Sequence, residues 1–188
     1  MNRFPHKLAT MAVTLALTAG SLAQASDVMG TNPSAANPPA GNVMNQPTLT
    51  LEGAKRVVAA AVAYARSHGA PGGSIAIVDA GGHTLYLERL DGTFAAASDV
   101  SIGKAQTAVN FAKPTRSLEE AINKGRPALI PVAGVTWFTP LQGGVPIVVD
   151  GRLIGGIGVS GALSQQQDEE IAMAGIQALV AASTKEKP

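Results

Sequence analysis

The sequence contains no cysteine, and aromatic residues make up only 4% of its 188 positions. Because it has no thiol, the chain cannot use a cysteine nucleophile, hold an iron–sulfur cluster through cysteines or build a cysteine-type zinc site. It cannot form a disulfide either, so the fold must be held by packing, to which association between copies would add. These absences exclude several classes of enzyme and metalloprotein.

Charge of either sign is also scarce, and the formal net charge is +1. Residues 1–25 carry Arg3 and Lys7 and no acidic residue, so the rest of the chain holds 12 basic and 13 acidic residues. No basic patch is visible along the sequence. We therefore expect neither nucleic acid nor a membrane to be a partner of the mature chain.

The first 25 residues predict a secretory signal peptide. Arg3, His6 and Lys7 precede an apolar run that is too short to span a bilayer securely, and small residues at positions 23 and 25 fit a cleavage site. The alternative is an N-terminal membrane anchor. The predicted localisation is periplasmic or secreted.

Residues 26–47 predict a flexible linker, because they contain four prolines and four asparagines without an apolar period. The folded domain is expected over residues 48–184. It opens with a helix that Thr50 can cap and that Gly69 should end. A β-hairpin should follow, since β-rich runs flank the turn sequence DAGG.

A second helix is expected to end at Pro114. In the short helix after it, Ser117 and Glu120 would form a capping box. Residues 126–142 hold three prolines and the single tryptophan, and predict a loop with room for one short strand.

The last part of the domain predicts a hairpin that turns at Asp150–Gly151, then a helix capped by Ser164 and Gln167. The expected order is α-β-β-α-α-β-β-α, with hairpins and no parallel crossover. This order predicts a single α+β domain in which an antiparallel sheet of about five strands is flanked by helices.

The second hairpin contains a GxGxxG sequence at Gly156, Gly158 and Gly161. In a dinucleotide-binding fingerprint such glycines open a helix that leads to a parallel strand. Here they lie within a strand pattern, and the chain ends one helix later. We interpret them as positions where a helix, a neighbouring subunit or a flat ligand comes close to the strand.

Four blocks of the sequence, matching in order and spacing, resemble one known family: LTLEGAKRVVAAAVAYARSHG, IAIVDAGGHTLYLERLDG, KAQTAVNFAKPT and GGVPIVVDGRLIGGIGVSGALSQQQDEEIA. They are similar to the GlcG/HbpS family, which includes the C-terminal domain of PduO-type proteins. The resemblance covers residues 48–183 and implies an antiparallel sheet flanked by helices. It also implies a homo-oligomer, dimer-based and octameric in some members, that binds haem. Exported members are linked to haem capture and redox sensing, and others lie beside glycolate-utilisation genes.

Haem iron takes an axial His, Cys, Met or Tyr ligand. Tyr64 and His68 lie four residues apart on one face of the first helix, and His83 is the other histidine after the signal peptide. These three are the candidate haem-binding residues. The alternatives are that Tyr64 packs on the sheet, that His68 interacts with the helix C-terminus, and that His83 hydrogen-bonds within its turn.

Other residues that suit a flat cofactor have simpler interpretations. Met173 is expected in the core. Trp137 and Phe138 could wall an apolar ligand, or could cover the edge of the core or a subunit interface. The resemblance further implies an acidic pair that binds iron near SDVSIGKA. Asp99 is present there, but Ile102 stands where the second acid is needed, so a metal site is not assigned.

Enzymatic chemistry finds little support. Ser160 lies in a sequence similar to a nucleophile elbow, but Ala162 replaces the final glycine and no histidine follows His83. The resemblance, together with the Tyr64 and His68 pair, predicts an exported, non-enzymatic haem-binding protein for haem capture or sensing. The alternative is a haem-free small-molecule-binding or accessory module of the glycolate-utilisation type, which the scarcity of histidine and aromatic residues favours.

Overall fold

A four-stranded antiparallel sheet organises the chain in a computed structural model that describes Gly41 and residues 44–185. The strands are β1 (Ser74–Asp79), β2 (Thr84–Arg89), β3 (Gly144–Val149) and β4 (Arg152–Ser160). Their order in the sheet is β2-β1-β4-β3, so two hairpins lie side by side and β1 pairs with β4. The predicted signal peptide and most of the predicted linker lie outside the described residues.

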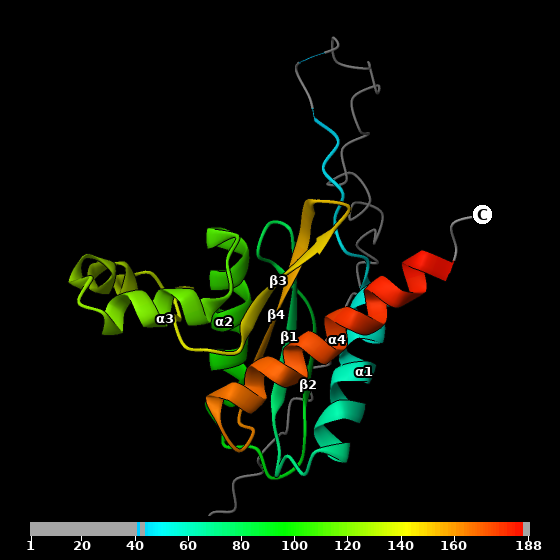
Figure 1. Ribbon diagram of the computed structural model, residues 1–188, viewed down its shortest axis with the longest axis horizontal. Helices are drawn as coiled ribbons and strands as arrows, with labels where there is room; N and C mark the ends of the chain where they lie inside the picture. The colour runs from blue at the N-terminus through cyan, green and yellow to red at the C-terminus, as the bar shows by residue number, and fades with distance from the viewer. Residues whose placement is uncertain (1–40, 42–43, 186–188) are drawn as a thin grey trace, which may run out of the picture. The chain divides into compact units, whose positions relative to one another are not determined.

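Helices cover both faces of the sheet (Figure 1). On one face lie α1 (Leu51–Ser67) and α4 (Gln165–Lys185), and on the other lies α2 (Ala97–Phe111). Two shorter segments continue beyond α2, the helix α3 (Thr115–Asn123) and the 3₁₀ helix η1 (Pro127–Gly134). The α+β class and the predicted element order are confirmed.

The main core lies between the sheet and the α1–α4 pair. Alternate residues of β1 and β4, such as Ile75 and Ile157, point to this side and meet Val57 of α1 and Ile171 of α4. On the α2 side the sheet presents mostly smaller residues, and Val78, with the partly buried Leu153 beside it, packs there against Ala105 and Val109. The helix on the α2 side therefore lies at a different distance from the sheet than the α1–α4 pair on the other side.

Glycines set the short distance on the α2 side. A Cβ atom built on Gly158 would lie 2.0 Å from the carbonyl oxygen of Ser101, and one on Gly156 would lie 2.7 Å from Val109. Gly144 of β3 meets the Lys104 carbonyl in the same way, at 2.4 Å. Gly156 and Gly158 of the GxGxxG sequence thus lie in β4 and allow a helix backbone to approach, as the sequence indicated. Gly161 follows the strand, and the three glycines do not form a phosphate loop.

Local signals placed most of the turns and caps correctly. Thr50 accepts a hydrogen bond from the Gly53 N–H at 3.1 Å, and Ser164 accepts one from the Gln167 N–H at 3.1 Å. Asp150 and Gly151 both have positive φ, 49° and 74°, as a two-residue hairpin turn requires.

Two details of the prediction differ in the structure. The sheet has four strands rather than about five, because the proline-containing segment 127–134 forms η1 in place of a short strand. Helix α3 begins directly after Pro114, whose φ of −57° already suits a helix start. Ser117 therefore lies inside the helix and donates to the Pro114 carbonyl at 2.7 Å instead of forming a capping box.

No helix within the described part of the chain is long and apolar enough to cross a membrane.

Candidate functional site

Tyr64 and His68 lie together at the C-terminal end of α1, as their spacing predicted. Their rings stack with centroids 3.8 Å apart and planes 14° from parallel. His68 caps the helix, and its Nδ1 donates to the Tyr64 carbonyl at 2.9 Å. This is the helix-end contact that we weighed as an alternative for His68. It leaves the other ring nitrogen, Nε2, without a role in the cap.

His83 lies apart from this pair, in the turn between β1 and β2. Its side chain is 83% exposed, and its Nδ1 is 3.3 Å from Asp79 Oδ1. Burial works to raise the pKa of Asp79, but hydrogen bonds from the His83 and Gly81 backbones, together with the attraction and hydrogen bond of the His83 side chain, lower that pKa below its usual value. The local arrangement is that of a turn histidine interacting with its own loop.

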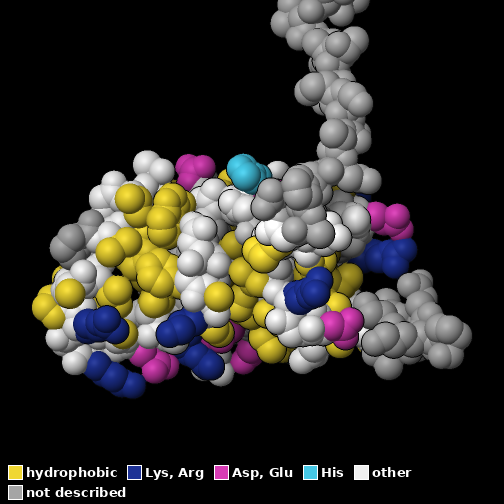
Figure 2. All heavy atoms as spheres, turned by 90° about the horizontal axis from the view of Figure 1, so that it is seen from above, with side chains coloured by type: hydrophobic (Ala, Val, Ile, Leu, Met, Phe, Trp, Pro, Cys, Tyr) yellow, Lys and Arg dark blue, Asp and Glu magenta, His cyan; other side chains and the backbone are white. Residues whose placement is uncertain are grey.

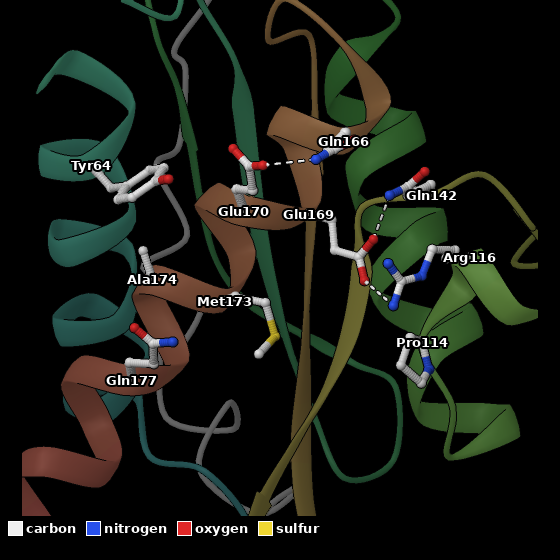
Figure 3. A pocket seen from close by; sticks show the side chains of 10 residues that line it. All are labelled: Tyr64, Pro114, Arg116, Gln142, Gln166, Glu169, Glu170, Met173, Ala174 and Gln177. Carbon is white, nitrogen blue, oxygen red and sulfur yellow. Dashed lines mark hydrogen bonds and ion pairs between the residues drawn. The ribbon is translucent and has the colours of Figure 1, made fainter. Parts of the chain in front are cut away.

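A groove of about 580 Å³ runs along the outer side of α4, and Tyr64 borders it (Figure 3). Tyr64 stands on the α1 side, and the opposite side comes from the start of α3 and the segment before β3. This volume suits a small-molecule ligand. The lining residues are Tyr64, Pro114, Arg116, Gln142, Gln166, Glu169, Glu170, Met173, Ala174 and Gln177. Neither His68 nor His83 is among them.

Two residues of types that can ligate haem iron therefore share the groove, Tyr64 and Met173. Within the described part of the chain, no group hydrogen-bonds the Tyr64 hydroxyl, which Figure 3 shows directed toward α4. Met173 is 41% exposed, so its predicted place in the core is wrong: Ala172 and Ile171 take the inward positions of this turn. The donor types in the groove fit a haem iron.

The other side of the groove is polar. The Glu169 carboxylate accepts a hydrogen bond from the Gln142 side-chain amide at 2.5 Å, and the Gln142 backbone N–H donates to Glu119 at 2.7 Å. Arg116 approaches Glu169 to 3.6 Å. A chain of contacts thus joins α4, the segment before β3 and α3 at one wall of the groove.

Next to this wall, a buried ion pair joins the two helix layers. Lys104 of α2 lies 2.9 Å from Asp168 of α4, with 3% and 7% of the two side chains exposed. The Lys104 ammonium also donates to the Val159 carbonyl at 2.7 Å, and Asp168 accepts from the Ala162 N–H at 3.0 Å. Burial raises the pKa of Asp168 above 3.8, and the Lys104 charge offsets only part of that.

The remaining candidates from the sequence are not grouped into a site. Phe138 is buried and packs with Trp137 and Phe111, with ring centroids 5.4–6.3 Å apart, and none of the three lines the groove. Asp99 is exposed in the first turn of α2. Among the residues that the structure describes, no group of three or more His, Asp or Glu side chains is arranged to hold a metal ion.

Comparison with known proteins gives these features a context. Residues 49–177 match the family model described as "Haem degrading protein HbpS-like". The chain belongs to the HbpS-like family. A 15.0 kDa protein from the dhaT–dhaS intergenic region of Citrobacter freundii is 32% identical over 120 residues, which are 63% of this chain and 84% of that protein. Escherichia coli K12 GlcG is 45% identical over 87 residues, so the match spans 46% of this chain and 63% of GlcG.

Solved structures share the fold. A double mutant of HbpS from Streptomyces reticuli has a TM-score of 0.66 at 34% identity, covering 74% of this HbpS-like chain and 92% of that one. A complex of PduOC with haem has a TM-score of 0.63 at 29% identity, covering 70% of this chain and 94% of that one. A protein that shares this fold has therefore been crystallised with haem.

Sequence reasoning missed the polar wall of the groove. Arg116, Gln142 and Glu169 lie far apart in the sequence, and each alone resembles a solvated surface residue. The one available signal was the run of acids Asp168, Glu169 and Glu170 at the start of α4, which is equally well explained as favourable charge near the positive end of the helix dipole.

Proposed function

We propose that this HbpS-like protein is an exported, non-enzymatic haem-binding protein that acts in haem capture or sensing. The observation that carries the proposal is the groove along α4, in which two iron-ligand types stand beside an arginine, Tyr64 and Met173 with Arg116. The solved complex of PduOC with haem supports it, since that chain shares this fold at 29% identity.

Different residues of the groove would bind different parts of the ligand. The Tyr64 phenol would supply an oxygen ligand, while Met173 and Ala174 would contact the apolar body of the ligand. Gln142 and Glu169 would hold the polar wall in place. Bound haem supplies an iron centre that can change its oxidation state, which is the property a sensor needs.

Titration of the purified residue 26–188 chain with hemin should produce a saturable shift of the Soret band at micromolar protein. Tyr64→Phe should weaken hemin binding about tenfold or more and change the ligand-sensitive absorption bands, because it removes the phenolic oxygen and leaves the ring. His83→Ala should leave the spectrum unchanged. His68→Ala tests whether the stacked neighbour contributes.

The absence of a saturable shift of the Soret band would contradict the haem proposal. A normal shift in Tyr64→Phe, His68→Ala and His83→Ala alike would show that the ligand lies elsewhere, with Met173→Leu as the next variant to test.

Export is the second part of the proposal, and the sequence of residues 1–25 supports it. When the full chain is produced in a Gram-negative host, mass spectrometry of the periplasmic or culture fraction should find a protein that begins at Ser26. An uncleaved chain in the membrane fraction would favour the N-terminal anchor instead.

Assembly into a homo-oligomer is the third part. Figure 2 shows hydrophobic side chains gathered at the end of the molecule that carries α3 and η1. Ile130, Val135 and Leu141, which belong to η1 and the segment after it, are 56%, 40% and 47% exposed. Apolar side chains at such exposure are typical of association surfaces.

The second candidate function is a haem-free module that binds a small molecule, such as an accessory protein of the glycolate-utilisation type. The polar wall supports it, because Arg116, Gln142 and Glu169 can hydrogen-bond a small polar ligand that lacks iron and a porphyrin ring. This candidate predicts a colourless protein after expression with added haem.

A further inference from the structure

Arg116 differs from the other charged residues of the groove in how little of its hydrogen-bonding capacity is used. Its nearest carboxylates are Glu169 at 3.6 Å and Glu120 at 4.0 Å, and both distances exceed a hydrogen bond. Within the described residues, no acceptor bonds its guanidinium. Five N–H donors are therefore available on a side chain that is 55% exposed at the groove.

The acid that faces Arg116 is held by another partner. Glu169 is only 12% exposed and accepts from the side-chain amide of Gln142, a residue whose backbone N–H donates to Glu119. Glu169 attracts the guanidinium to this wall without occupying its donors. The arrangement orients Arg116 and leaves the N–H groups at the edge of its guanidinium plane to a ligand.

We propose that Arg116 is the residue that recognises a carboxylate of the bound ligand, and so fixes the orientation of that ligand in the groove. An arginine fork matches a carboxylate with two parallel hydrogen bonds, which a lysine cannot reproduce. Glu170, which also lines the groove, repels an anionic group placed beside it on α4. The carboxylate end of the ligand therefore lies at Arg116, and its apolar body extends toward Tyr64.

This inference rests on the proposed function, because haem carries two propionate carboxylates. A small carboxylic acid would offer the same chemistry, and the probes below separate the two sources. Metal-free protoporphyrin IX keeps both carboxylates and removes iron ligation, so it reports on Arg116 independently of Tyr64. Its dimethyl ester removes the carboxylates and keeps the ring.

Fluorescence titration should show that Arg116→Gln binds protoporphyrin IX about tenfold more weakly than the unaltered chain, while the two bind the dimethyl ester equally. Arg116→Lys should recover only part of the loss. Arg126→Gln, which removes the same charge outside the groove, should bind both probes normally. A merely structural role of Arg116 would weaken the ester as much as the diacid.

Three results have distinct meanings. If the unaltered chain binds protoporphyrin IX and Arg116→Gln binds it equally well, the inference is overturned while the haem proposal stands. If porphyrins do not bind but millimolar glycolate does, and Arg116→Gln abolishes that, the carboxylate role stands and the haem proposal fails. If neither probe binds, both fail.

Discussion

Replacing Lys104 by methionine should lower the free energy of unfolding by about 3–5 kcal/mol at neutral pH, because a buried carboxylate loses its counter-charge. Methionine fills a similar volume, so the loss reflects charge more than packing. Asp168 would keep its hydrogen bond from Ala162 but would lie 7% exposed without a cation. The midpoint of urea-induced unfolding measures the change.

The double variant Lys104→Met with Asp168→Asn is the matched control. Asparagine keeps an acceptor for the Ala162 N–H and removes the negative charge, so the double variant should be more stable than Lys104→Met alone. If the losses of unfolding free energy in Lys104→Met and in Asp168→Asn instead sum to the loss in the double variant, the pair is not coupled and this interpretation of the ion pair is wrong.

The pH dependence follows from the raised pKa of Asp168. A carboxyl group with a higher pKa in the folded state binds its proton more tightly there, so its contribution favours folding at low pH and is lost as pH rises through the folded value. Lys104 offsets part of this effect. Lys104→Met should therefore enlarge the rise in the pKa of Asp168. The difference in the free energy of unfolding between the variant and the parent should narrow as pH falls toward 3.8.

The parts of this fold that the sequence predicts are those controlled by neighbours in the chain. Asp150 and Gly151 form a turn through their own φ angles, and Thr50 caps a helix three residues away. Tyr64 and His68 were correctly brought together because one helical turn separates them. The antiparallel class followed from two such hairpins, since neither leaves a connection long enough for a parallel crossover.

The candidate site depended on contacts that no local pattern contains. Lys104 and Asp168 are 64 residues apart, and each has the sequence context of an exposed helix residue. Gln142 and Glu169 meet only because α4 crosses the end of β3. Met173 was misplaced because helical spacing alone does not say which side of a helix faces the sheet, and here Ala172 faces it.

Alanine at Gly158 should destabilise the domain by about 3 kcal/mol or more, since its Cβ would lie 2.0 Å from the Ser101 carbonyl oxygen and 2.6 Å from the Ala105 nitrogen. Both atoms belong to the backbone of α2, so a change of rotamer cannot relieve the clash. The helix would have to move away from β4, which would also loosen the packing of Val78 on that face. Chemical denaturation of the purified variant measures the loss.

A graded series of alanine variants gives this prediction its control. At Gly156 the nearest atom is the Val109 Cγ2 at 2.7 Å, in a side chain that can adjust, and the nearest backbone atom is the Ala105 carbonyl oxygen at 2.9 Å, which is farther than at Gly158; Gly156→Ala should therefore cost less than Gly158→Ala. Gly134 has nothing within 4 Å of the added carbon, and Gly134→Ala should be nearly neutral. Equal stabilities for Gly158→Ala and Gly134→Ala would contradict the close approach of α2. The order Gly158, Gly156, Gly134 would show that the two glycines within β4 serve helix packing.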